Sequence, residues 1–268
     1  MERIITTGND YRPDPGFVGL GVSCCLRRLS AGREVRVVLM SNVQLIHGDC
    51  MEYMATLPDK AFELAIVDPP YAVGADDGNF GRGGAKAIAF TNSQTATYRK
   101  DLKQYANAKT VPDKEYFKEL FRISKNQIIW GANYYPQYLN HSGWIVWDKE
   151  KTDGLLSEAE LAYQSLYKTV KIYRHVWEGF RKGKGSFEQT ACRTIHPNQK
   201  PVALYQWLLK NYAKQGDKIL DTHLGSGSSA IAADIMGFDF VGLEIDKDYY
   251  EAALDRFNRH KQKLVMEF

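Results

Sequence analysis

The sequence predicts an α/β fold built on a largely parallel sheet. Two observations lead to this prediction. Short apolar runs with strand character alternate along the chain with segments of helical spacing, a pattern typical of a sheet covered by helices rather than of a β-sandwich. In addition, a strand, a glycine-rich turn, a helix and a second strand follow one another over residues 217–246, which is the order of a nucleotide-binding unit.

Composition is permissive about function. The 268 residues are 44% hydrophobic and 25% charged, which fits one large α/β domain or a domain with a substantial insertion. The net charge is only +3, so any contact with nucleic acid requires a local basic patch. The four cysteines include no Cys-x-x-Cys pair, which argues against a structural zinc site and a disulfide framework. No apolar run approaches the roughly 18 residues that span a bilayer and no signal peptide is recognisable, so we expect a cytoplasmic protein.

The amino-terminal residues 1–39 show neither helical nor strand periodicity and look unlike the rest of the chain. Met40 then precedes a strand-like stretch, as a native start would. We therefore expect residues 1–39 to be a peripheral or disordered extension and residues 40–268 to form the main domain. The alternative is an arm that packs on the domain or touches a partner.

The first predicted strands end in polar residues. A strand over 43–46 leads to Asp49 and a helix over about 50–57, and a strand over 61–67 leads to Asp68-Pro69-Pro70-Tyr71. Consecutive prolines cannot donate ladder hydrogen bonds, so this strand must stop and leave a rigid tetrapeptide at its carboxyl end. A carboxylate, a carbonyl and an aromatic face on a stiff turn suit a flat base with an exocyclic amine. The plainer interpretation is a proline-rich loop with a solvated aspartate and a packed tyrosine.

A glycine-rich segment follows the tetrapeptide, with five glycines over residues 74–84. It is either a surface connection or a loop that closes over a substrate, and its place beside the tetrapeptide favours the second interpretation. The turn over 131–136 is expected near the same ligand edge. The elements predicted next are a helix over 112–123 and strands over 127–130, 144–147 and 159–166.

A basic segment covers residues 171–200, with seven lysines and arginines against two glutamates, a net charge of +5. It is interleaved with Tyr173, Trp177 and Phe180, and basic residues beside aromatic ones suit phosphate contacts and base stacking. A charge run standing alone is more often a solvated face. Together with the glycine-rich segment, this gives the candidate nucleic-acid contacts Arg82, Lys86, Arg174, Arg181, Lys182 and Lys184.

Two further helices are predicted in the last third of the chain. Residues 196–201, His-Pro-Asn-Gln-Lys-Pro, begin a helix that runs to about residue 213, because proline is well tolerated in a first helical turn and apolar residues then recur with helical spacing. A final helix is predicted over 247–263.

Between these helices lies the nucleotide-binding pattern. A strand over 217–221 leads into a turn with the sequence Gly-x-Gly-x-x-Ala over 225–230, a helix over 231–236 and a strand over 240–244. The glycines allow the backbone to approach a ligand closely. Glu244, at the end of the second strand, is placed to accept hydrogen bonds from both ribose hydroxyls of a nucleoside.

Four segments, 67–71, 196–201, 221–227 and 241–246, together resemble the amino-group DNA methyltransferases that use S-adenosylmethionine. Their order, with the catalytic tetrapeptide first and the cofactor glycines last, resembles the permuted beta subgroup of that family. The resemblance covers about residues 43–263. It implies a doubly wound, mostly parallel seven-stranded sheet with inserted loops, and a methyltransferase domain that acts on the N6 amine of adenine in DNA after base flipping.

The resemblance also implies roles for residues. Asp68, Pro69, Pro70 and Tyr71 would be catalytic, with Asp68 and the Pro69 carbonyl orienting the amine and Tyr71 holding the flipped base. His223 stands where the family usually has phenylalanine, so it would either preserve the packing or weaken cofactor binding. No metal is expected. The residues expected to bind the cofactor are Asp49, Lys200, Asp221, His223, Gly225, Ser226, Gly227, Glu244 and Asp246.

Double-stranded DNA is the expected partner, contacted by segments 72–110 and 168–195, while a homodimer and a cognate restriction endonuclease stay open. The closest alternative is methylation of the N4 amine of cytosine, but the family's cytosine enzymes more often have serine where Asp68 stands. Methylation of RNA or of a side-chain amide, and a catalytically silent cofactor-binding module, are further alternatives. A dehydrogenase would explain the glycine turn but not the double proline.

Overall fold

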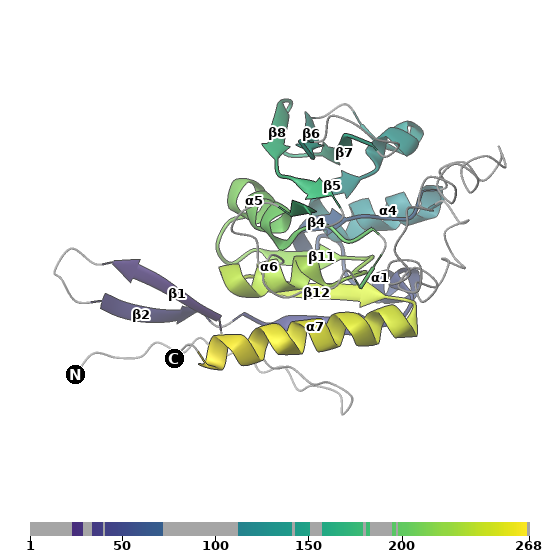
Figure 1. Ribbon diagram of the computed structural model, residues 1–268. Coiled ribbons are helices and arrows are strands. Elements are labelled where there is room, and N and C mark those ends of the chain that lie inside the picture. The colour runs from purple at the N-terminus through teal and green to yellow at the C-terminus, as the bar shows by residue number, and fades with distance from the viewer. Residues whose placement is uncertain are drawn as a thin grey trace, which may run out of the picture.

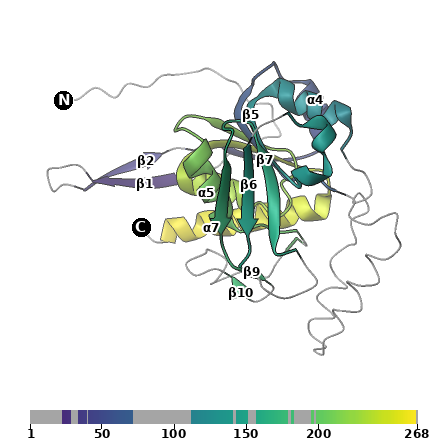
Figure 2. The same ribbon diagram turned by 90° about the horizontal axis from the view of Figure 1, so that it is seen from above.

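The chain folds around one large sheet with helices on both of its faces, in a computed structural model (Figures 1 and 2). This confirms the predicted α/β class. The structure describes residues 23–28, 34–39, 41–71, 112–140, 143–150, 157–178, 181–182, 195–196 and 198–266.

The sheet has eight strands in the order β3-β12-β11-β4-β5-β7-β6-β8, rather than the seven expected. Only β7 runs against its neighbours, since it pairs antiparallel with both β5 and β6, and all the other pairings are parallel. The sheet is therefore mostly parallel, as predicted. The strand bounds are β3 Val43–His47, β4 Phe62–Val67, β5 Ser124–Trp130, β6 Gly143–Asp148, β7 Ala159–Gln164, β8 Val170–Arg174, β11 Lys218–Asp221 and β12 Asp239–Glu244.

The strand that was not predicted is β8, at one edge of the sheet. Val170 and Ile172 are 62% and 50% exposed, so this strand lacks a buried face that would mark it in the sequence. Its pairing with β6 converts part of the expected basic loop into a sheet edge.

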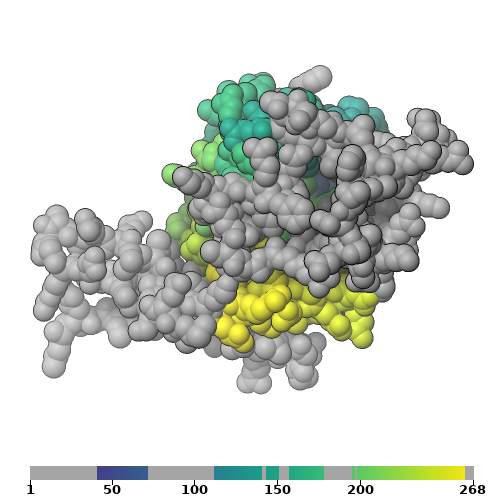
Figure 3. Space-filling view, viewed as in Figure 1, coloured from purple at the N-terminus to yellow at the C-terminus, as the bar shows by residue number. Residues whose placement is uncertain are grey.

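The helices divide between the two faces of the sheet (Figure 1). Helices α1, Cys50–Ala55, and α4, Lys114–Ile123, pack on one face. Helices α5, Val202–Tyr212, α6, Ser228–Met236, and α7, Lys247–Met266, contribute to the core on the other. In the space-filling view, α7 forms a continuous yellow stretch of the molecular surface (Figure 3).

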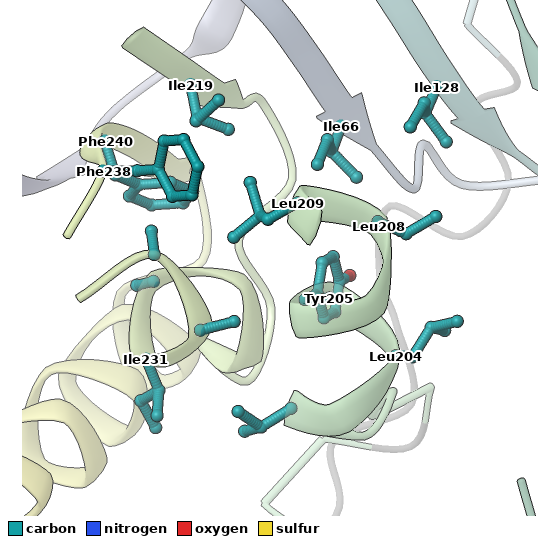
Figure 4. Close-up of a cluster of buried hydrophobic side chains, with 14 of the residues drawn as sticks. Ile66, Ile128, Leu204, Tyr205, Leu208, Leu209, Ile219, Ile231, Phe238 and Phe240 are labelled. Atoms are coloured by element: carbon teal, nitrogen blue, oxygen red, sulfur yellow. The ribbon is translucent and has the colours of Figure 1, made fainter. Parts of the chain in front are cut away.

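Strand β4 shows why the sequence here is a continuous apolar run rather than an alternating one. Leu64 and Ile66 point into the core beneath α5 and α6, whereas Ala65 and Val67 point into the core beneath α1 and α4. All four are at most 1% exposed, as expected for a parallel strand buried on both faces. Figure 4 shows Ile66 facing the α5 side chains on the first of these faces.

Four short strands and two turns lie outside the large sheet. Strands β1, Ser23–Arg28, and β2, Glu34–Leu39, form an antiparallel pair within residues 1–39, where no strand was expected. The peripheral position of that extension stays a prediction. Strands β9, Trp177–Glu178, and β10, Arg181–Lys182, form a second antiparallel pair. Two short 3-10 helices, η1, Ala132–Tyr134, and η2, Pro136–Tyr138, follow β5. Among the helices of the described ranges, none combines the length and apolarity needed to cross a membrane.

The burial of the central strands predicts that two valines contribute differently to the free energy of unfolding. Val241 in β12 is 1% exposed, whereas Val170 in β8 is 62% exposed. Val241→Ala should lower the free energy of unfolding by about 2 kcal/mol, because apolar contact is lost and a cavity is left. Val170→Ala should change it by less than about 0.5 kcal/mol. Urea denaturation followed by circular dichroism measures both, and equal losses would contradict the described burial.

Candidate active site

The candidate site lies at one edge of the sheet, where five neighbouring parallel strands end. Asp49 follows β3, Glu244 ends β12, Asp221 ends β11, Asp68 follows β4 and Gly131 follows β5. Parallel neighbours end at the same edge, which is where open α/β sheets bind ligands. The fold thus brings the tetrapeptide and the glycine turn together although about 150 residues separate them in sequence.

The tetrapeptide is held by Tyr135, a residue for which no role was predicted. Its hydroxyl lies 3.0 Å from the Pro69 carbonyl oxygen and 2.8 Å from that of Pro70. A hydroxyl has one proton, so the two carbonyls share one donor. A carbonyl oxygen accepts two hydrogen bonds, so the Pro69 carbonyl keeps capacity for a ligand.

The Tyr71 ring is set between Gly131 and Tyr134. Gly131 has φ +67°, and a Cβ atom there would lie 2.6 Å from Tyr71 Cδ1, so only glycine allows this approach. The Tyr134 ring stacks on Tyr71 with centroids 4.6 Å apart and planes 8° apart, and Tyr134 is 42% exposed. The tetrapeptide thus ends in a fixed aromatic ring with a second, exposed aromatic ring lying on it.

Asp68 has one bonded and one open carboxylate oxygen. Lys200 Nζ donates to Asp68 Oδ2 at 2.5 Å. Asp68 Oδ1 is buried and has no hydrogen-bond partner among the residues that the structure describes. Burial raises the pKa of the Asp68 carboxyl, while the Lys200 charge acts in the opposite direction. A buried acceptor without a donor is costly, so this atom requires a donor from outside the described residues.

Lys200 was expected near the cofactor, but the structure places its ammonium between two carboxylates. Besides Asp68, it lies 3.1 Å from Glu160 Oε2. Burial lowers the pKa of Lys200, yet Asp68 and Glu160 outweigh this effect and raise the pKa well above its ordinary value. Glu160 also pairs with Lys149, at 2.7 Å. Despite burial, Lys200 and Lys149 lower the pKa of Glu160 to about 2.

The glycine turn is bound to both acidic residues of the neighbouring strands. The Gly225 amide donates to Glu244 Oε2 at 2.9 Å, and the Asp246 amide donates to Oε1 at 3.0 Å. Asp221 accepts from the His223 amide at 3.0 Å and from the Ser229 hydroxyl at 2.6 Å. Each carboxylate oxygen still has a lone pair to offer. Burial raises the pKa of Asp221 to about 7.

The remaining predicted cofactor residues shape the backbone. Asp49 accepts from the Met51 amide at 2.7 Å and caps α1, and Asp246 accepts from two amides at the start of α7. Gly227 has φ +71° and begins α6. The Ser226 carbonyl accepts from Arg256, a fully buried side chain of α7, at 2.7 Å.

His223 behaves as a neutral aromatic residue. Its Nδ1 lies 2.9 Å from the Thr222 hydroxyl, and its ring meets the edge of Tyr116 with centroids 5.5 Å apart. Burial lowers the pKa of His223 to about 4, so the imidazole is uncharged at neutral pH. A neutral ring is compatible with a position at which the resembling family has phenylalanine.

The predicted nucleic-acid contacts are only partly within the described residues. Arg174 ends β8 at the same edge of the sheet and lies 3.3 Å from Asp148 Oδ2. Arg181 and Lys182 form β10, whereas Arg82, Lys86 and Lys184 lie outside the described residues. Of the neighbouring aromatic residues, Tyr173 packs on Trp207 with ring centroids 5.2 Å apart. The Tyr173 ring thus packs against the core.

Sequence reasoning missed Tyr135, Glu160 and Lys149. The first was within reach, because the turn over 131–136 was expected at this edge. Glu160 left a weaker signal, an acidic residue inside the otherwise apolar strand β7. Lys149 left none, because a lysine after a strand resembles any solvated loop residue.

Comparisons with known proteins identify the family and support the fold. A family model described as DNA methylase, N6_N4_Mtase, matches residues 62–255. The YubD protein of Escherichia coli (strain K12) is 25% identical over 235 residues, covering 80% of this chain and 89% of that protein. Type II methyltransferase M.HpaI of Haemophilus parainfluenzae is 23% identical over 240 residues, covering 80% and 74%. Among solved structures, PvuII DNA methyltransferase (cytosine-N4-specific) matches with a TM-score of 0.51 and 12% identity, covering 81% of this chain and 86% of that one, which supports the fold.

The lowered pKa of His223 can be measured directly by an NMR titration. Its imidazole signals in a proton NMR titration should have a midpoint near pH 4, because burial disfavours the charged ring. Between about pH 6.5 and pH 4 the unfolded chain binds a proton that the folded chain does not, so this residue destabilises the fold as the pH falls through that window. His223→Phe identifies the signals and should reduce the acid sensitivity. A midpoint above pH 6 would contradict the described burial.

Proposed function

The chain belongs to the DNA methylase family, and from this premise we propose that it transfers a methyl group from S-adenosylmethionine to the N6 amine of adenine in double-stranded DNA. One observation carries the proposal. Asp68 Oδ1 is a buried acceptor with no partner among the described residues, and it lies on the sheet edge that also bears the glycine turn. An exocyclic amine is a donor of the kind that this atom lacks.

The chemistry follows from the weakness of that amine as a nucleophile. Its lone pair is delocalised into the ring, so attack requires the nitrogen to become tetrahedral. Asp68 Oδ1 and the Pro69 carbonyl each accept one amine hydrogen bond, which aims the lone pair at the methyl group. In the transfer, the nitrogen–carbon bond would form as the sulfur–carbon bond of the donor breaks, the sulfur would keep the electron pair as a neutral thioether, and one proton of the methylated amine would pass to water. Positioning of this kind contributes several kcal/mol to lowering the barrier.

The acidic residues around the glycine turn fit the methyl donor, which supplies an electrophilic methyl group on sulfur when bound. Glu244 and Asp221 are 7% and 1% exposed, and each has acceptor capacity left. In the proposed arrangement Glu244 accepts the ribose hydroxyls, Asp49 lies by the adenine, and Asp221 with Gly225 and Gly227 holds the methionine part. Asp221 then faces an ammonium group, which favours its ionised form.

The base must leave the duplex to reach Asp68, which costs a few kcal/mol. Stacking on an aromatic side chain stabilises the flipped base by about 1–3 kcal/mol, which offsets part of this cost. We assign this role to Tyr71, and a base that stacks there takes the place of the Tyr134 ring. Burial raises the pKa of Tyr71, so its phenol stays neutral during the reaction.

A covalent route through the neighbouring thiol is disfavoured. Burial, with a contribution from Asp49, raises the pKa of Cys50 to about 12, so the thiolate that would act as a nucleophile is scarce at neutral pH. Direct transfer to the amine requires no such group.

The second candidate is transfer to the N4 amine of cytosine, which needs the same acceptors and a smaller base. The solved PvuII enzyme is named as cytosine-N4-specific. The aspartate at the head of the tetrapeptide favours adenine, because the resembling cytosine enzymes more often have serine there. Phosphate contacts are proposed for Arg174 at the end of β8 and for Arg181 and Lys182 of β10.

Incubation with radiolabelled S-adenosylmethionine and duplex DNA, followed by digestion to nucleosides, tests the function. We expect N6-methyl-2′-deoxyadenosine from the unaltered chain and none from Asp68→Ala, because the amine loses its carboxylate acceptor. Cofactor binding measured by calorimetry should be nearly unchanged in Asp68→Ala. Asp255→Ala, on the exposed surface of α7, is the matched control and should retain activity. Label in N4-methylcytosine would select the second candidate, and near-normal turnover by Asp68→Ala would refute the role of Asp68.

The raised pKa of Asp221 predicts how cofactor binding depends on pH. Above about pH 7 the carboxylate is ionised and attracts the ammonium group, whereas below it the carboxyl is protonated and neutral. Because the amino group of the ligand itself loses its proton at about pH 8, the affinity for S-adenosylmethionine should be highest at about pH 7.5 and fall several-fold toward pH 6. Calorimetric titrations at several pH values measure this. Asp221→Asn should bind weakly with a flat profile, and a steep profile in that variant would exclude Asp221 as the titrating group.

A further inference from the structure

A chain of four alternating charges runs away from the catalytic carboxylate across neighbouring strands. It consists of Asp68 after β4, Lys200 before α5, Glu160 in β7 and Lys149 after β6, with successive contacts of 2.5, 3.1 and 2.7 Å. Their side chains are 3% to 22% exposed. Two positive and two negative charges cancel, so the set is neutral as a whole.

Two tryptophans lie against the lysines of this chain. Lys200 Nζ lies 5.5 Å from the centre of the Trp130 ring, and Lys149 Nζ lies 5.1 Å from the centre of the Trp147 ring. The two indoles meet edge to face and are at most 1% exposed. Each indole restricts the position of its ammonium by a cation–π contact. The low polarity around the two buried indoles also strengthens the ionic contacts of the lysines.

In this geometry the Lys200 ammonium has a carboxylate on each of two sides, which restricts its position. A lysine with one carboxylate partner pivots on four flexible bonds, whereas Lys200 donates a hydrogen bond to Asp68 and lies within ion-pair distance of Glu160 Oε2, which has no hydrogen-bond partner among the described residues. Lys149 in turn holds the other oxygen of Glu160. Fixing Lys200 fixes the rotation of the Asp68 carboxylate, so that Oδ2 is always the bonded oxygen and Oδ1 the open one.

We propose that Glu160, anchored by Lys149, is a positioning residue for methyl transfer, which acts by holding Lys200 against Asp68 so that Asp68 Oδ1 faces the substrate amine. This inference rests on the proposed function. Its alternative is an ion-pair set that contributes only to stability.

The charges of Glu160 and Lys149 also act on the titration of Asp68. Glu160 raises the pKa of Asp68 and Lys149 lowers it, each through its charge. Neutralising one or the other should therefore shift the titration of Asp68 in opposite directions, which a general loss of stability would not do. The other groups that interact with Asp68 stay in place in both variants: Lys200, Tyr71, Tyr135, Tyr205 and Asp221.

The test compares Glu160→Gln and Lys149→Met with Glu63→Gln. Glu63 also pairs with a lysine on the neighbouring strand, Lys125, but near the starts of β4 and β5, away from the site. For Glu160→Gln we expect kcat to fall about tenfold with the affinities for S-adenosylmethionine and duplex DNA unchanged. Lys149→Met should cause a smaller fall, and Glu63→Gln none. Thermal unfolding establishes that each variant is folded.

A second measurement does not depend on activity. The Asp68 carboxyl carbon, assigned with Asp68→Asn, is followed by 13C NMR as the pH is changed. Its midpoint should move down in Glu160→Gln and up in Lys149→Met, because Glu160 raises the pKa of Asp68 and Lys149 lowers it. The acid limb of the pH–kcat profile should move in the same two directions.

The outcomes separate the two proposals. If kcat of folded Glu160→Gln stays within about twofold of the unaltered chain, or if the Asp68 midpoint does not move as stated, the positioning role is overturned. If Glu160→Gln does not fold, the direction of the shift in Lys149→Met decides. If the unaltered chain methylates no DNA, the proposed function fails, and the NMR measurement still decides whether this charge chain sets the state of Asp68.

Discussion

The ion pair between Lys200 and Asp68 is the contact on which the candidate site depends. It joins residues 132 positions apart, one at the end of β4 and the other in the turn before α5. A charge so deeply buried is stable only with a well-placed partner, and removing either partner leaves the other uncompensated. The pair therefore ties the tetrapeptide to the carboxyl-terminal half of the chain, which carries the glycine turn.

The sheet gives this contact its place. Because β4 and β11 are parallel neighbours, Asp68 and Asp221 end at the same edge, and β12 and β3 extend that edge to Glu244 and Asp49. The order of the strands thus brings the residues proposed for the methyl donor and those proposed for the base to one edge of the sheet. Local contacts then orient each group, with Tyr135 on the proline carbonyls and the Gly225 amide on Glu244.

Much of this arrangement was predictable from sequence. Strands buried on both faces, such as β4 and β12, appear as apolar runs, and the glycine turn and double proline mark where they stop. The exposed strand β8 was missed because edge pairing leaves no hydrophobic pattern. The contact of Lys200 with Asp68 was not predicted, since a motif gives the neighbours of a residue in sequence but not the carboxylate that its ammonium meets across the sheet.

Strand β7 runs opposite to its neighbours, and this changes which of its residues reach the carboxyl edge of the sheet. At the carboxyl edge of a parallel sheet, functional residues are supplied by the ends of strands and the loops after them. Because β7 runs the other way, that edge receives its beginning, and Glu160 is the second residue of the strand. One reversal therefore allows the chain to add to the edge a residue from the first part of a strand. Glu160 pairs with Trp147 of β6, so its backbone is held by a neighbouring strand rather than by a loop.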